Sequence, residues 1–358
     1  MTPGVVRQIR PSVDGPPMEE LGGVAMHRKS FGLPTAVVVT CVISVVAGQA
    51  AGQKPNVSPN ARAAAPKPPR AVPRTPDGRP DMQGVWDFRT ITPLERPSQF
   101  AAREVLTPEE AAALEQRTAS TRVDRAPRAG DPGTYNQFWF DYGTRVSDDK
   151  RTSLVLDPPD GKLPPLTPEA EKRAAARAEV VRNPATGPED RPTWERCLLG
   201  FNSGPPIMPS GYNNNIQIVQ TRDHVVVLNE MVHDARIVPL DGRPRIALPR
   251  WMGDARGRWE GDTLVVETVN FTKNGTGTIG LRALTDENLR LTERFTLADA
   301  ETLVYEFTVD DPTVWTRPWT AMLSMKKTDD QIYEYACHEG NHGMIGILTG
   351  ARSQDVSK

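Results

Sequence analysis

The chain has 358 residues, of which 43 are basic and 45 acidic, and its formal net charge at pH 7 is -2. This balance gives no electrostatic reason to expect a nucleic acid or an anionic membrane surface as partner. The length is enough for one large domain with a substantial buried core.

Residues 1–53 are expected to be a leader followed by a signal peptide. His27, Arg28 and Lys29 precede an uncharged stretch whose apolar part, 36–47, is too short to span the ~30 Å of a bilayer as a helix. Small residues follow it, which suits cleavage during export. The sequence therefore predicts a periplasmic or secreted protein whose mature chain has no membrane span.

Residues 54–80 are rich in proline, alanine and arginine and have almost no large apolar side chains. Such a segment cannot bury enough surface to offset the entropy lost on ordering. It is predicted to be a disordered linker before a folded body that begins near Gly84.

Residues 81–210 are predicted to form an irregular segment with two helices that pack on a sheet. Both helices begin with Leu-Thr-Pro-Glu, in which threonine can act as N-cap and proline occupies the first helical position. The first has Thr107 and Glu110 at capping-box spacing and is expected to end near Arg117. The second is expected over residues 168–182.

Residues 211–350 are predicted to form an antiparallel β domain, because apolar residues alternate with polar ones between short turns. About nine or ten strands are more than an open sheet usually holds, since exposed strand edges promote aggregation and a closed or folded-over sheet protects them. The predicted fold class is mainly β: a barrel-like sheet of the lipocalin type or a folded-over sheet, with two or three peripheral helices. The expected strands lie near residues 216–220, 225–231, 235–240, 256–259, 263–271, 289–297, 303–310, 318–326 and 332–337.

Four carboxylates lie in phase with apolar residues of their own predicted strands. A buried carboxylate needs a hydrogen-bonding or charged partner, or its pKa rises. A polar cavity would satisfy them, with Arg236, Arg258 and Arg294 near in sequence. The alternative is an inverted phase, in which the glutamates face solvent and aromatic residues fill the core. The four are Glu230, Glu267, Glu293 and Glu334, and the aromatic residues are Tyr305, Phe307, Tyr333 and Tyr335.

The peptide from His233 to Arg236 is a second cluster of polar residues. Histidine is suited to act as a general base, and Arg236 to stabilise negative charge. Neighbouring residues of a strand point to opposite faces, so the alternative is a turn in which Asp234 caps backbone N–H groups. The predicted catalytic candidates are Glu230, His233, Arg236, Glu334 and His338.

Two cysteines, Cys197 and Cys337, remain after the expected loss of Cys41 with the signal. Disulfides persist outside the cytosol, so a bridge between the two is expected. Two buried free thiols are the alternative.

The peptide from His338 to His342 has the spacing His-Glu-x-x-His of zinc hydrolases. That motif works on a helix, where both imidazoles reach one metal ion. Gly340 and Gly343 disfavour a helix, and the preceding residues alternate as a strand. We therefore expect this peptide to be the end of the last strand, without a cofactor. The alternative is a zinc site in which His338 and His342 bind the metal ion and Glu339 acts as the base.

Several peptides of the chain resemble, as a set, those of an uncharacterised family of exported proteins that is common in soil bacteria. The resemblance implies export, and it implies no catalytic residue because that family has no established activity. The peptides are 80–86, 135–140, 151–154, 229–236, 258–268 and 333–341.

These observations predict an exported globular β protein that binds a small molecule or performs acid/base chemistry in a barrel cavity. A zinc-dependent hydrolase and a structural envelope protein are the alternatives.

Overall fold

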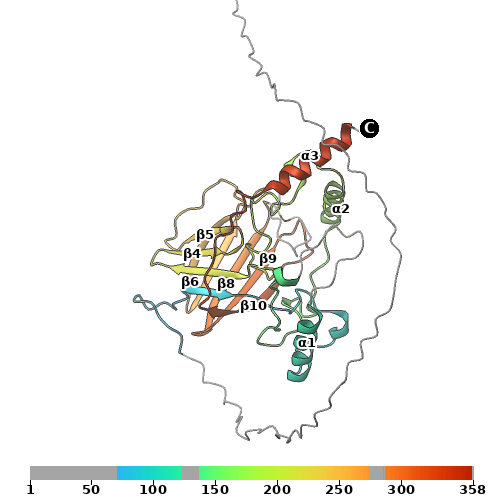
Figure 1. Ribbon diagram of the computed structural model, residues 1–358. Coiled ribbons are helices and arrows are strands. Elements are labelled where there is room, and N and C mark those ends of the chain that lie inside the picture. The colour runs from blue at the N-terminus through green and yellow to red at the C-terminus, as the bar shows by residue number, and fades with distance from the viewer. Residues whose placement is uncertain (1–70, 123–136, 274–284, 286, 357–358) are drawn as a thin grey trace, which may run out of the picture. The chain divides into compact units, whose positions relative to one another are not determined.

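The computed structural model describes residues 71–122, 137–273, 285 and 287–356 (Figure 1). All of them belong to one compact unit, Ala65–Lys358. The predicted leader and signal, 1–53, and most of the predicted linker lie outside the described residues. None of the helices in the described part has the length and apolar character needed to cross a membrane.

The described strands form one antiparallel sheet. Nine of them follow the order β5-β4-β3-β1-β10-β9-β8-β7-β6, and β2 pairs with β10 beside this path. The strands are β1 (Gly84–Asp87), β2 (Val155–Asp157), β3 (Asn215–Gln220), β4 (His224–Asn229), β5 (Ala235–Pro239), β6 (Asp254–Glu260), β7 (Thr263–Val269), β8 (Arg290–Asp299), β9 (Thr302–Asp310) and β10 (Trp319–Thr328).

Strand β1 lies in the middle of this sheet, between β3 and β10. The sequence predicts an irregular segment over residues 81–210, and the structure corrects this at Gly84–Asp87. Trp86 fixes the strand from within the core, where its ring is fully buried and its indole N–H donates to the Met82 carbonyl at 2.8 Å. Through β1 the sheet joins β3–β5 to β6–β10.

The sheet folds over on itself and is not closed into a barrel, because no ladder of hydrogen bonds joins the terminal strands β5 and β6. These strands nevertheless lie against each other through side chains. A Cβ atom on Gly257 would lie 2.6 Å from Leu240 Cδ2 and 2.9 Å from Val238 Cγ1, so a larger residue there would require these side chains to shift. Figure 1 shows the yellow early strands crossing the orange late strands, as expected for a folded-over sheet.

The core lies between the two halves of the folded sheet. In β8, β9 and β10 every second side chain is buried, which is the period that places one face of a strand inward. These strands confirm the ranges predicted at 289–297, 303–310 and 318–326. The inward residues include Phe295, Tyr305, Phe307, Trp319 and Leu323.

The strand predicted at 332–337 is wrong. These residues have no strand pairing in the structure, and α3 (His342–Val356) follows them. The alternation there does not reflect a buried face, because Tyr333 is 72% exposed. The Tyr335 N–H donates to the ring of His233 instead of a neighbouring strand.

The two predicted helices are confirmed as α1 (Pro108–Thr121) and α2 (Pro168–Arg182), each capped by its threonine. In α1 the Glu110 N–H donates to Thr107 Oγ1 at 3.2 Å and the Thr107 N–H to Glu110 Oε2 at 3.0 Å, which is the predicted capping box. Helix α1 runs past the expected end at Arg117. Short 3-10 turns are η1 (Ser98–Phe100), η2 (Gln137–Trp139), η3 (Pro188–Asp190) and η4 (Met231–His233).

A buried ion pair links the two halves of the sheet across the core. Arg236 of β5 donates both terminal nitrogens to the Glu293 carboxylate of β8, one of them at 2.9 Å, and both side chains are buried. The Tyr305 hydroxyl donates to Glu293 Oε1 at 2.7 Å and accepts the Ile207 N–H at 3.1 Å. Burial raises the pKa of Tyr305, and the Glu293 charge raises it further, so the hydroxyl stays a donor.

The predicted inward phase is right for Glu293 and wrong for Glu267. Glu267 lies on the outer face, where its carboxylate accepts from Arg258 at 2.7 Å. Strand β7 has apolar side chains buried on both faces, such as Val265 and Val266, so alternation alone cannot assign its phase.

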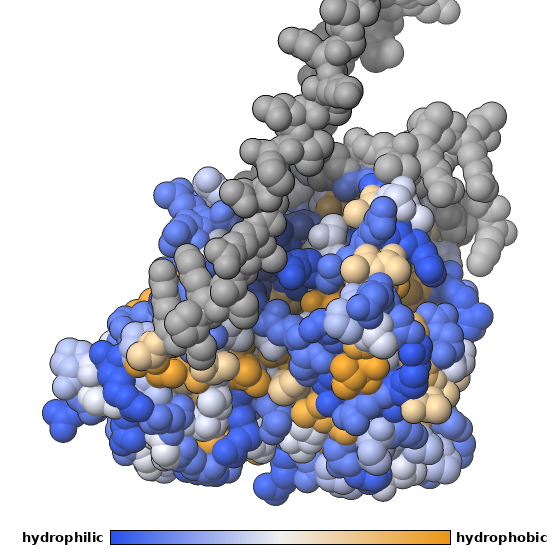
Figure 2. Space-filling view, turned by 90° about the horizontal axis from the view of Figure 1, so that it is seen from below, coloured by the Kyte–Doolittle hydropathy of each residue, from blue (hydrophilic) through white to orange (hydrophobic). Residues whose placement is uncertain are grey.

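The face of the molecule seen in Figure 2 is largely hydrophilic, with small hydrophobic areas between the polar ones.

Removing the Glu293 carboxylate should destabilise the fold strongly. Glu293→Ala leaves the Arg236 guanidinium buried without a counter-ion, and we expect the free energy of unfolding to fall by about 3–5 kcal/mol. The matched control, Glu267→Ala, removes the same side chain from an exposed pair and should cost about 1 kcal/mol or less. Urea unfolding followed by tryptophan fluorescence measures both. Equal losses for the two variants would contradict the structure.

Candidate functional site

A pocket of about 600 Å³ lies where the β4–β5 connection meets the loop before β3 and the C-terminal segment. Its walls are mainly apolar and aromatic, with a few polar side chains among them. The lining residues are Trp194, Glu195, Cys197, Gly200, Phe201, Tyr212, Met231, Val232, Glu334, Tyr335, Ala336, Cys337, Gly340, Asn341, Gly343, Met344 and Ile347.

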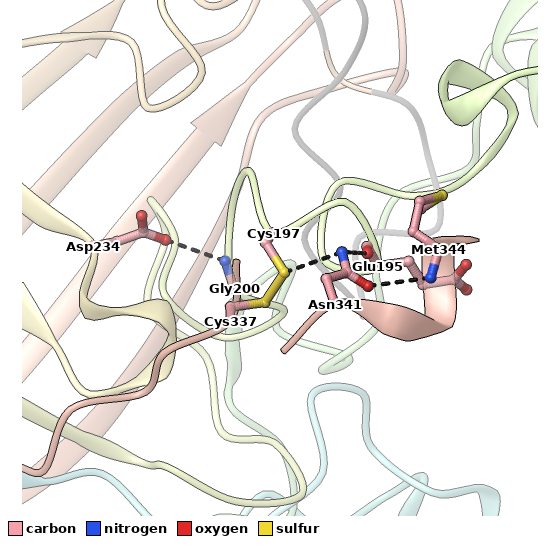
Figure 3. Close-up of a disulfide and its surroundings, with 7 residues drawn as sticks. All are labelled: Glu195, Cys197, Gly200, Asp234, Cys337, Asn341 and Met344. Carbon is pink, nitrogen blue, oxygen red and sulfur yellow. Dashed lines mark hydrogen bonds between the residues drawn. A yellow bond between two sulfur atoms is a disulfide. The ribbon is translucent and has the colours of Figure 1, made fainter. Parts of the chain in front are cut away.

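The predicted disulfide between Cys197 and Cys337 is present (Figure 3). Both cysteines line the pocket. The Asn341 amide beside it donates to the Glu195 carbonyl at 2.9 Å. Its oxygen accepts the Met344 N–H at 3.2 Å, at the start of α3. The bridge and these hydrogen bonds hold the C-terminal segment against the loop before β3.

Three aromatic rings form one side of the pocket. Trp194 and Phe201 have ring centroids 6.4 Å apart with planes at 80°, and Phe201 and Tyr212 have centroids 5.1 Å apart with planes at 89°. These are edge-to-face contacts, which the ring quadrupoles favour. Trp194 is 37% exposed, so one ring of the series is open to the surface. The thioethers of Met231 and Met344 add adaptable apolar surface.

The β4–β5 connection has strained backbone next to this pocket. Val232 has φ 61° and His233 has φ 54°, in the left-handed region that a β-branched residue rarely adopts. Such residues cost about 1–3 kcal/mol and persist only where surrounding contacts hold them. Here the Asn229 N–H donates to the Asp234 carbonyl at 2.8 Å, and His233 Nδ1 accepts the Tyr335 N–H at 3.1 Å. A neutral His233 ring therefore carries its proton on Nε2.

Asp234 joins the connection to the loop that carries the disulfide. Its Oδ2 atom accepts the Gly200 N–H at 3.1 Å, drawn in Figure 3, and the Ser203 hydroxyl at 2.9 Å. Burial raises the pKa of Asp234, while these hydrogen bonds and the nearby His338 act in the opposite direction. Asp234 lies in a turn between strands, as the alternative predicted, but the backbone N–H that it accepts is that of Gly200 in a distant loop.

The structure does not bring the five predicted catalytic residues to one place. Glu334 lines the pocket, whereas His233 is not among the lining residues and accepts the N–H of Tyr335, which is one of them. Arg236 is in the core with Glu293. His338 is exposed and lies near Asp234.

Glu230 faces another part of the molecule. It is half-buried and accepts from the Asn215 amide at 2.9 Å. Burial raises the pKa of Glu230, and Asp141 and Arg89 are the charges that act on it. A second cavity of about 420 Å³ there is lined by charged residues that pair with one another, among them Arg89 with Asp87 and Asp141.

The His-Glu-x-x-His peptide does not lie on one helix. His338 and Glu339 are in a turn, and α3 begins at His342. Within the described ranges, no group of three or more histidine, cysteine, aspartate or glutamate side chains is placed to hold a metal ion.

Sequence reasoning missed the aromatic residues of the pocket. Trp194, Phe201 and Tyr212 lie in a loop without strand or helix periodicity, so no pattern assigns them to one wall. The one sequence signal near these rings was Cys197, because its predicted disulfide with Cys337 places the two cysteine-bearing segments side by side.

No protein-family model and no curated protein matches the chain.

Removing the disulfide should destabilise the fold, including the segments that form the pocket. Cys197→Ser with Cys337→Ser frees a loop closed over a separation of 140 residues, and we expect the free energy of unfolding to fall by up to about 4–5 kcal/mol. Denaturant unfolding with and without dithiothreitol measures this. The reductant should bring the wild type to the level of the variant and leave the variant unchanged. A variant as stable as the oxidised wild type would contradict the prediction.

Proposed function

We propose that the protein binds a small molecule with an apolar body in the pocket described above. The observation that carries the proposal is the pocket itself, whose volume of about 600 Å³ lies within the range of about 300–1,000 Å³ typical of ligand sites. Like such sites, it combines aromatic and aliphatic walls with a few polar groups. We also propose that the protein is exported, which is supported by a disulfide of the kind that persists outside the cytosol.

Binding is better supported than acid/base catalysis. General acid/base chemistry needs titratable groups that converge on one reacting atom. Here Arg236 is committed to Glu293 in the core, and His233 Nδ1 already accepts a backbone N–H. Only Glu334 of the five candidate residues lines the pocket. A purely structural envelope protein is the remaining alternative, and a binding measurement separates it from the proposal.

Filling the pocket should weaken binding strongly without unfolding the protein. Ala336 is exposed at the pocket wall, so Ala336→Trp places a large ring in the cavity without disturbing the core. The neutral fluorophore N-phenyl-1-naphthylamine is the probe. We expect the wild type to bind it and Ala336→Trp to bind it at least about tenfold more weakly, since the tryptophan occupies the apolar volume that the probe requires.

The matched control is Ile237→Trp, which adds the same ring on the exposed face of β5, outside the pocket. It should bind the probe like the wild type, and thermal unfolding should show that both variants fold. A wild type that does not bind, or equal binding by Ala336→Trp, would overturn the proposed function.

A further inference from the structure

The pocket carries an unbalanced negative charge. Among the described residues that line it, the charged side chains are Glu195 and Glu334, and there is no lysine, arginine or histidine. Glu195 is neutralised by Arg191, whose Nε and Nη2 atoms donate to its carboxylate at 2.6 and 3.0 Å. Glu334 is exposed to solvent at the pocket wall and forms no ion pair with any residue of the described part. A ligand in the pocket therefore meets one uncompensated carboxylate.

The aromatic wall adds negative potential of a second kind. The face of an aromatic ring carries the negative part of its quadrupole, and it attracts cations placed within about 6 Å of the ring centre. Trp194, Phe201 and Tyr212 all line the pocket, and their successive planes lie at 80° and 89°, so neighbouring rings are not stacked face to face. Rings arranged in this way resemble the walls of an aromatic cage for an ammonium group.

The arginines nearest in sequence do not supply the missing positive charge. Arg191 is held by Glu195, as described above. The Arg196 guanidinium lies over the ring of Trp251, 5.9 Å from its centroid, which is within the reach of about 6 Å for a cation–π contact. Trp251 does not line the pocket. Both cations are thus engaged elsewhere.

From these contacts we propose that the ligand is an organic cation: a quaternary ammonium or protonated amine attached to an apolar or aromatic body. The inference rests on the proposed function and names its ligand class. The ammonium group lies against the aromatic rings with Glu334 as counter-ion, and the apolar body contacts Met231, Met344 and Ile347. Anionic ligands are disfavoured, because no lining side chain of the described part can neutralise them.

Displacement of bound N-phenyl-1-naphthylamine tests the ligand class. The competitors are benzyltrimethylammonium, its neutral isostere 2,2-dimethylpropylbenzene, and the anion 3-phenylpropanoate. We expect the cation to displace the probe at about tenfold lower concentration than the neutral compound, and the anion to be the weakest. Higher ionic strength should reduce the advantage of the cation.

Two variants test which residues of the pocket favour the cation over the neutral compound. Glu334→Gln should weaken the cation about fivefold and leave the neutral compound unchanged, whereas the control Glu267→Gln, on the outer face, should change neither. Trp194→Leu should weaken the cation more than the neutral compound.

The outcomes separate the two proposals. If the neutral compound displaces the probe as well as the cation does, or Glu334→Gln leaves the cation unaffected, the cation inference is overturned while the binding function stands. If the wild type does not bind the probe at all, the proposed function fails, and the ligand class fails with it.

Discussion

The ion pair between Arg236 and Glu293 is the interaction on which the arrangement of this protein depends. Both charges are buried, so neither has solvent to stabilise it and each requires the other. Because Arg236 belongs to β5 and Glu293 to β8, this requirement fixes one half of the folded sheet against the other. The terminal strands β5 and β6 lack a hydrogen-bonded ladder between them, and the ion pair with its Tyr305 and Ile207 partners supplies a directional contact across the core.

The same constraint positions the pocket. Strand β5 begins at Ala235, one residue before Arg236, so fixing Arg236 also fixes the strained connection that precedes it. From this connection Asp234 holds Gly200, and His233 holds the C-terminal segment through Tyr335. The disulfide then joins the two held segments to each other. The pocket is therefore built from loops and the start of α3, and these segments are tied to the end of the sheet.

Local patterns in the sequence predicted much of the fold and little of the site. Both helix starts and most strands were found, because threonine caps and buried faces leave short-range signals. The four-residue strand β1 is too short to show alternation, and the exposed residues before α3 alternate without pairing. Glu334 was predicted as a candidate residue. Trp194 and Phe201 line the same pocket, but they are far from Glu334 in the sequence, and the disulfide brings the two segments together.

A double-mutant cycle on Arg236 and Glu293 tests most directly whether this pair holds the two halves of the sheet together. The variants are Arg236→Met, Glu293→Leu and the pair combined, each followed by denaturant unfolding. Each single change leaves one buried charge unpaired, whereas the combined change removes both. The account predicts a coupling free energy of about 2–3 kcal/mol, with the combined variant more stable than the sum of the single losses implies. Losses that add to within about 0.5 kcal/mol would contradict it.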